Sequence, residues 1–203
     1  MPYSSCGIFC GMLGAMATIA KPLSDARVVT ILKAGGVAVI LTDTIYGIVG
    51  SALKKSVVLR IYRLRKRNLK KPMIVLVASM RELARFGVRV SPAIGRFLRG
   101  AWPGRVSVAL PVRGKKWEYL HRGTDYIAFR MPLKKSLREL LLKTGPLVAP
   151  SANPEGKPPA TTIQEAKKYF GARVDCYVDE GKFVRKPSTL VKVVEGKPLV
   201  IRK

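Results

Sequence analysis

Acidic residues are scarce in this chain. Its 203 residues hold 12 Asp and Glu against 38 Lys and Arg, which gives a formal net charge of +26. Such a surplus attracts polyanions, so it indicates a nucleic acid or a phosphorylated ligand as a partner. Solubility charge in a protein from a hot habitat is the alternative. That adaptation enriches Lys together with Glu, so the missing acids favour the polyanion.

Histidine and cysteine are also rare, which limits the chemistry that side chains can perform. The single histidine, His121, excludes a zinc site of the usual His/Cys kind, and we assign it no role. Cys6, Cys10 and Cys176 show no paired spacing, so they argue against a disulfide framework and for a reducing, cytoplasmic setting. No run of eighteen apolar residues exists, and we expect no membrane-spanning helix.

The first fifteen residues, MPYSSCGIFCGMLGA, carry no charge and lack the positive start of a signal peptide. We expect residues 1–15 to be a disordered tail or the result of a misassigned start, because the sequence from Met16 onward resembles the natural start of a protein. The remaining residues 16–203 suffice for one sizeable core. Short apolar runs between amphipathic segments, without repeats or linkers, predict a single α/β domain.

Apolar runs and capping residues locate the expected elements. Strands are predicted at residues 37–41, 45–53, 73–79, 106–112, 126–132 and 147–150, followed by a strand pair, 188–194 and 198–203, around a short Gly turn. Helices are predicted from Ser24 to Gly35, over 55–67, from Ser91 to Gly100, over 136–145, and after a Thr162–Glu165 capping box.

Three polar segments lie beside the expected strands, where α/β proteins place ligand loops. They are Thr42-Asp43-Thr44, the basic run 65–72 and the segment 150–153, PSAN. Taken singly, each has a plainer interpretation: a polar turn, a solvated cationic face and a turn-former. The nucleotide signatures GxxxxGK[ST] and GxGxxG are absent, as is a carboxylate pair placed for acid–base chemistry.

In this order and spacing, the segments resemble the YrdC-like family of threonylcarbamoyl-adenylate synthases. The resemblance rests on GGVAVILTDTIYGIVG, IYRLRKRNLKKPMIVLV, WPGRVSVAL, IAFRMP, PSANPEGKPPATT and PSTLV with a closing IR. It covers roughly residues 24–203 and implies the catalytic domain alone, over residues 16–203. The implied fold is a twisted mixed α/β sheet with flanking helices around a basic cavity.

The resemblance implies a nucleotidyltransferase that condenses ATP, L-threonine and bicarbonate into threonylcarbamoyl-AMP and pyrophosphate. A separate transferase complex would pass the group to the adenosine beside a tRNA anticodon. Both reactants bring their own reactive groups, so the protein would supply alignment and charge cancellation. Mg²⁺ is expected to enter with ATP, without a metal ligand from the protein.

The resemblance also assigns roles to individual residues. The residues expected to act in catalysis are Arg65, Arg67, Ser151 and Asn153. Those expected to contact ATP are Arg67, Lys71, Asn153, Thr161 and Arg202. Those expected to contact threonine are Thr44, Arg130, Ser151 and Ser188.

Three positions depart from the family pattern. Arg65 stands where Lys is usual, which keeps the charge but replaces a compact ammonium by a planar fork. Leu76 stands where many relatives have His, so one polar threonine contact would be lost. Tyr126 stands where many relatives have Thr.

These departures leave two main hypotheses. The first is the synthase. The second is an RNA-binding member of the same fold with weak or no synthase activity, whose partner would be tRNA or double-stranded RNA. The intact polar set favours the enzyme, because RNA binding alone would not require it. A third hypothesis, which we favour less, is a hydrolase or regulator that uses the cavity for another nucleotide.

Overall fold

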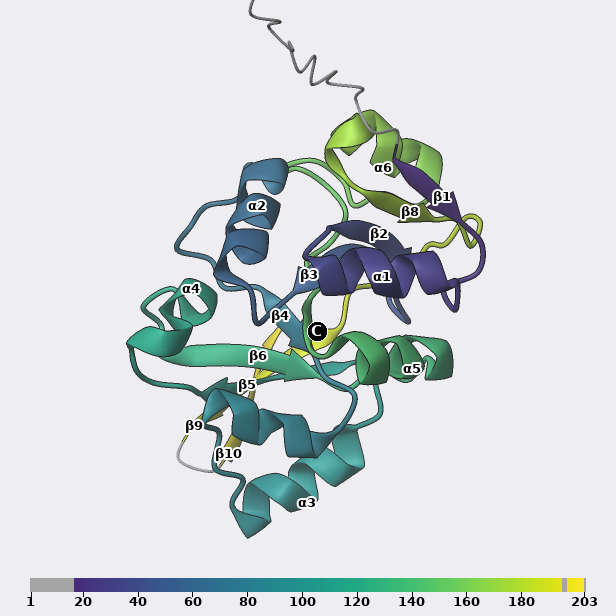
Figure 1. Cartoon of the computed structure of the whole chain (residues 1–203). Helices are drawn as coiled ribbons and strands as arrows, with labels where there is room; N and C mark the ends of the chain where they lie inside the picture. The colour runs from purple at the N-terminus through teal and green to yellow at the C-terminus, as the bar shows by residue number, and fades with distance from the viewer. Residues whose placement is uncertain (1–16, 195–196, 203) are drawn as a thin grey trace, which may run out of the picture.

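The computed structural model describes residues 17–194 and 197–202, and it forms one mixed sheet with helices on both faces (Figure 1). The strands are β1 (Thr18–Ala20), β2 (Ala38–Leu41), β3 (Tyr46–Ser51), β4 (Ile74–Leu76), β5 (Val106–Pro111), β6 (Tyr126–Arg130), β7 (Leu147–Val148), β8 (Cys176–Val178), β9 (Thr189–Val194) and β10 (Lys197–Arg202). The α-helices are α1 (Ala26–Ala34), α2 (Lys55–Arg65), α3 (Pro92–Ala101), α4 (Glu118–His121), α5 (Lys135–Thr144) and α6 (Ile163–Phe170). The 3₁₀ helices are η1 (Met80–Phe86), η2 (Lys115–Trp117) and η3 (Gly171–Arg173).

The sheet contains ten strands in the order β1-β8-β2-β3-β7-β4-β6-β5-β9-β10. The sheet contains parallel pairs such as β4–β6 and β5–β9 and antiparallel pairs such as β2–β3 and β5–β6, which confirms the mixed α/β sheet. The segments predicted at 73–79 and 147–150 form only short strands. Short β1 and β8, which the apolar pattern did not reveal, pair with each other at one end of the sheet.

The predictions for residues 1–15, Met16, Cys6 and Cys10 lie outside the described residues. Cys176 is buried in β8, where burial raises the pKa of its thiol to about 11. Within the described ranges, no helix is both long enough and apolar enough to cross a membrane.

Alternating side chains give the sheet two hydrophobic faces. In β2, Ala38 and Ile40 pack in the cluster that includes α1 and α5, whereas Val39 belongs to the cluster that includes α2 and α6. This alternation is the two-residue period of a strand covered on both sides. Figure 1 shows α1 and α5 lying beside one another along one side of the sheet. A Cβ added at Gly50 would lie 2.5 Å from Val57 of α2, so that helix packs directly on β3.

Side-chain caps mark the start of three helices, α1, α3 and α6. Asp25, not Ser24, caps α1, because its carboxylate accepts the backbone N–H of Arg27 at 2.9 Å. The helix ends where predicted, at Gly35 with a φ of 100°. Thr162 caps α6 as predicted, but the Glu165 carboxylate turns to the N–H of Thr161, one residue before the expected capping-box partner.

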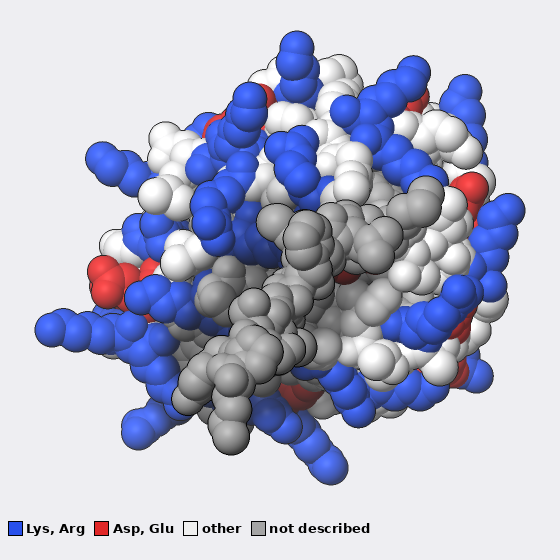
Figure 2. All heavy atoms as spheres, turned by 45° about the horizontal axis from the view of Figure 1, so that its top comes forward, with Lys and Arg blue, Asp and Glu red and all other residues white. Residues whose placement is uncertain are grey.

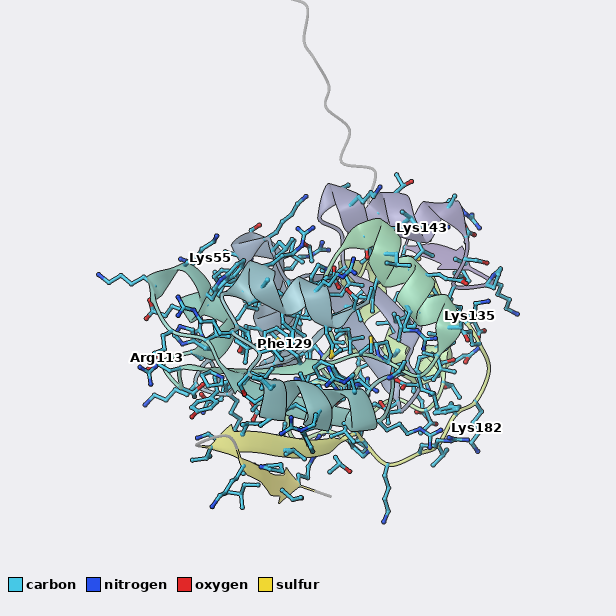
Figure 3. All side chains as sticks on the ribbon, turned by 90° about the horizontal axis from the view of Figure 1, so that it is seen from below. Lys55, Arg113, Phe129, Lys135, Lys143 and Lys182 are labelled. Atoms are coloured by element: carbon cyan, nitrogen blue, oxygen red, sulfur yellow. The ribbon has the colours of Figure 1, made fainter. Side chains whose placement is uncertain are left out.

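The aromatic ring of Phe129 should anchor the core beneath β6. Phe129 is fully buried, its centroid lies 5.0 Å from that of Phe86, and Figure 3 shows it inside the molecule. We expect Phe129→Ala to destabilise the fold by about 3–5 kcal/mol, which corresponds to a Tm decrease of about 10 °C. Leu142→Ala, at a residue that is 74% exposed, is the control for thermal unfolding. Equal decreases for the two variants would contradict this assignment.

Candidate functional site

A cavity of about 310 Å³ lies over the sheet where the three polar segments meet. Its lining includes Ile74, Ala128 and Ala109, which are paired neighbours on β4, β6 and β5. Two alanines at adjacent positions leave space above the strands. Seven of the ten expected site residues also line this cavity: Thr44, Arg65, Arg67, Arg130, Ser151, Ser188 and Arg202.

Arg65, the last residue of α2, is buried despite its position on a basic helix. Its Nε donates to the carbonyl oxygen of Asn153 at 3.0 Å, and its Nη2 donates to Ser151 Oγ at 3.0 Å. Burial, with a smaller contribution from nearby Arg67, lowers the pKa of Arg65 to about 10, so its side chain stays charged at neutral pH. The carboxyl end of a helix favours such a cation. The plainer interpretation of this run, a solvated cationic face, therefore does not apply to Arg65.

Asn153 does not line the cavity. Its amide nitrogen donates to the carbonyl oxygens of Pro154 and Lys157 at 2.9 and 2.6 Å, and its Oδ1 accepts from Arg65 at 3.3 Å. In this conformation the amide therefore shapes the loop after β7. Ser151 remains at the cavity wall, where it forms an isolated antiparallel bridge with Gly47 of β3.

Arg130 and Asp43 form a buried ion pair below the cavity. Arg130 Nη1 donates to Asp43 Oδ1 at 2.5 Å, and the other carboxylate oxygen accepts the N–H of Leu133 at 2.8 Å. Burial lowers the pKa of Arg130, and Asp43 partly offsets that shift. The arginine expected beside threonine thus lines the cavity with an internal counter-ion already in place. Asp43 belongs to the predicted polar segment 42–44, but nothing in the sequence indicates Arg130 as its partner.

Hydroxyl groups form another part of the cavity wall. The Oγ1 atoms of Thr42 and Thr44 lie 3.1 Å apart, within hydrogen-bonding distance. Ser188 Oγ lies 2.8 Å from Ser107 Oγ. Arg202 Nη2 donates to the Ser188 carbonyl oxygen at 2.9 Å, so the last described residue of β10 is held at the site.

The remaining residues expected to contact ATP are Lys71, Thr161 and Arg67, and the side chain of each is bound to a neighbouring group. Lys71 Nζ forms an ion pair with Glu155 at 2.5 Å, and the Thr161 hydroxyl donates to Glu165 at 3.1 Å. Arg67 lines the cavity, and its guanidinium donates to the carbonyl oxygens of Lys71 and Pro72 at 3.2 and 2.9 Å. Lys71 and Thr161 therefore lie outside the cavity lining, each with a glutamate as its neighbour.

The three departures from the family pattern fall in different environments. Arg65 belongs to the loop network described above. Leu76 is fully buried in the core cluster and is not a lining residue. Tyr126 lines the cavity, and the ammonium group of Lys192 lies 4.1 Å from its ring centroid.

The ordered segments that build this cavity match one family model. The Sua5/YciO/YrdC model, described as "Telomere recombination", matches residues 30–203. The chain belongs to this family. Two similar proteins are named as threonylcarbamoyl-AMP synthases. The one from Pyrococcus abyssi is 28% identical over 84% of this chain, and the putative one from Mycobacterium leprae is 31% identical over 87% of this chain.

The coverage of these family members differs. The chain spans 81% of the M. leprae protein but only 51% of the P. abyssi protein. A crystal structure of P. abyssi Sua5 complexed with L-threonine superimposes with a TM-score of 0.81 and 25% identity, over 92% of this chain and 56% of that one. The expected fold is therefore confirmed, and a homologue with this fold binds threonine.

The ion pair between Asp43 and Arg130 should be essential for stability. Both side chains are at most 5% exposed, so Asp43→Asn would leave a buried guanidinium without its opposing charge. We expect a loss of about 3–5 kcal/mol in the free energy of unfolding. The exposed Glu139→Gln, beside Lys135 at 4.0 Å, is the control. A double variant, Asp43→Asn with Arg130→Met, should recover part of the loss in urea titrations. Additive losses would contradict this coupling.

Proposed function

We propose that this protein is a threonylcarbamoyl-AMP synthase that joins ATP, L-threonine and bicarbonate and releases pyrophosphate. The observation that supports this most strongly is the composition of the cavity. Arg65, Arg67, Arg130 and Arg202 line it, together with hydroxyl groups from distant parts of the chain, and no Asp or Glu of the described residues does. Such a site suits a carboxylate and a polyphosphate, which are both anions.

Different residues of the cavity would bind threonine and the ATP phosphates. Thr44, Ser188 and Arg130 would hold the threonine hydroxyl and carboxylate groups. Arg67 would oppose the charge that grows on the phosphates as the carbamate oxygen attacks the α-phosphorus and pyrophosphate leaves. Alignment of the two reactants would supply much of the remaining rate enhancement.

The size of the cavity suggests how the nucleotide would lie. A volume of about 310 Å³ is at the small end of ligand pockets. Threonine and the reacting phosphate would therefore fill the cavity, and the rest of the nucleotide would extend over the rim. The residues expected to contact ATP but absent from the lining are Lys71, Asn153 and Thr161, and they would serve the part of the nucleotide outside the cavity.

The donor set at the site does not fit a resident Mg²⁺. This ion prefers several oxygen ligands, usually carboxylates, phosphates and water. Among the described residues, no group of three His, Cys, Asp or Glu side chains could hold a metal ion. A Mg²⁺ ion would therefore enter with the ATP phosphates, and the protein's own part is the positioning of the phosphates by its cations.

The synthase hypothesis predicts pyrophosphate release from ATP only when threonine and bicarbonate are both present. Arg67→Ala should lower kcat/KM at least about a hundredfold, as expected for the loss of a group that stabilises transition-state charge. Arg63→Ala, at an exposed arginine within α2, should change it little. Release that is independent of threonine, or no release at any substrate concentration, would reject the synthase.

A second candidate function, RNA binding, is supported by another groove. Five cations and one acid line this groove of about 540 Å³, which crosses η2, α4 and the start of α2: Lys55, Lys70, Lys115, Lys116, Arg122 and Glu118. Lys and Arg also outnumber acids on the face that Figure 2 turns forward. A phosphate backbone, such as that of tRNA, would fit this excess of cations.

RNA binding through this groove should depend steeply on salt. Each phosphate contact contributes about 0.7–0.9 to the slope of log affinity against log salt. Lys115→Glu with Lys116→Glu should therefore reduce the slope for tRNA by about 1.4–1.8. Lys135→Glu with Lys143→Glu is the control, because Figure 3 shows these residues at the opposite end of the molecule from Lys55. Equal reductions in both double variants would reject the groove as the RNA site.

A further inference from the structure

The loop after α2 holds a carboxylate from a distant part of the chain. Glu155 Oε2 accepts the backbone N–H of Asn68 at 2.6 Å, and Oε1 accepts from Lys71 Nζ at 2.5 Å. The bond from Lys71, then that from Asn68, with Arg67 adding a smaller effect, lowers the pKa of this carboxyl. Each carboxylate oxygen therefore has its own donor, and the side chain is anionic at neutral pH.

The backbone of Glu155 is fixed beside this loop. Its N–H donates to the Arg65 carbonyl oxygen at 2.7 Å, and the Asn153 side chain donates to the carbonyl oxygens of Pro154 and Lys157 in the same turn. The carboxylate is thus tethered to the end of α2. Its side chain is still 28% exposed, and that of Lys71 is 58% exposed, so solvent and solutes reach the pair.

The donors around this carboxylate are those that bind phosphoryl oxygens. A backbone N–H and an ammonium group converge on it, with a guanidinium close by, and such groups recognise phosphate as well as carboxylate. The proposed function assigns one of these residues, Arg67, to the ATP phosphates, and Lys71 is a residue expected to contact ATP. The carboxylate therefore occupies a position that suits a phosphoryl group.

We propose that Asn68 and Lys71 form a phosphoryl subsite that Glu155 occupies as an internal competitor, to be displaced by the polyphosphate of the substrate. This inference rests on the proposed function, and it adds Asn68 as a ligand and Glu155 as a specificity determinant. A tethered carboxylate competes at a high effective concentration. A nucleotide must therefore bring several phosphates to displace it, which favours ATP over AMP.

An ordinary structural ion pair would behave in the opposite way. If the Lys71–Glu155 ion pair only stabilised the conformation of the loop, its removal would make the loop less ordered and weaken nucleotide binding. If Glu155 competes with phosphate, its removal strengthens binding. Pyrophosphate, as the product, would also leave less readily once the carboxylate cannot return, so product inhibition would increase.

Calorimetric titration of the full chain with inorganic pyrophosphate, ATP and AMP tests this inference without relying on turnover. Glu155→Gln should lower the Kd for pyrophosphate and ATP by about two- to fivefold, which corresponds to the interaction energy of an exposed ion pair. The Kd for AMP should change less. Glu139→Gln removes the same formal charge at a distant exposed position and should change none of them. Glu155→Ala, which also removes the bond to Asn68, should show the same sign as Glu155→Gln.

Hydrogen exchange gives a second measurement. In the wild type, pyrophosphate should accelerate exchange in residues 155–158, and this acceleration should be smaller in Glu155→Gln. Weaker binding in both Glu155 variants, a change equal to that of Glu139→Gln, or no pyrophosphate binding by any form would overturn the inference. If pyrophosphate binds more tightly to the variants while threonine-dependent release is absent, the phosphoryl subsite stands and the synthase hypothesis fails.

Discussion

The geometry of the site depends on the hydrogen bonds that the buried guanidinium of Arg65 donates. It joins the end of α2 to the loop after β7 through Ser151 and Asn153, residues 86 and 88 positions further along the chain. Its Nη1 is buried without a partner among the described residues, so the bonds to Ser151 and Asn153 must offset an incompletely satisfied charge. Because Lys offers no planar fork, one Lys side chain could not reproduce this pattern of bonds. The departure from the family pattern at this position therefore acts through loop architecture as well as charge.

Much of the fold could be predicted because periodicity reports local environment. The apolar run at 37–41 became β2, and the apolar face of 55–67 became the buried face of α2. Boundaries set by competing side chains were harder: Asp25 lies next to Ser24, and either could cap α1 on sequence grounds. The three-residue strands β1 and β8 are too short to show a period, and they form because β1 pairs with β8 and β8 pairs with β2.

The candidate site could be predicted as a set of residues, since seven of the ten line one cavity. What could not be predicted is which group each side chain contacts. The partners Lys71 and Glu155 are 84 residues apart, and Arg130 and Asp43 are 87 apart. No spacing or propensity reports such pairs. The resemblance placed Asn153 and Thr161 near ATP, whereas their hydrogen bonds to the surrounding loops depend on the folded backbone.

Because acids are scarce, the few cations that have a carboxylate partner should differ from the others in the salt dependence of ligand binding. In a chain with a net charge of +26, most surface cations have no internal counter-ion to lose, and an RNA backbone would bind them by releasing salt ions. The site cations Arg130 and Lys71 are different, because each already has a carboxylate. A ligand that displaces such a carboxylate exchanges one anion for another and releases fewer salt ions. Phosphoryl binding at Lys71 should therefore be less sensitive to salt than RNA binding in the groove lined by Lys115 and Lys116, even though both surfaces are basic. In the proposed function, the few acids would thus distinguish a selective anion site from a general electrostatic surface.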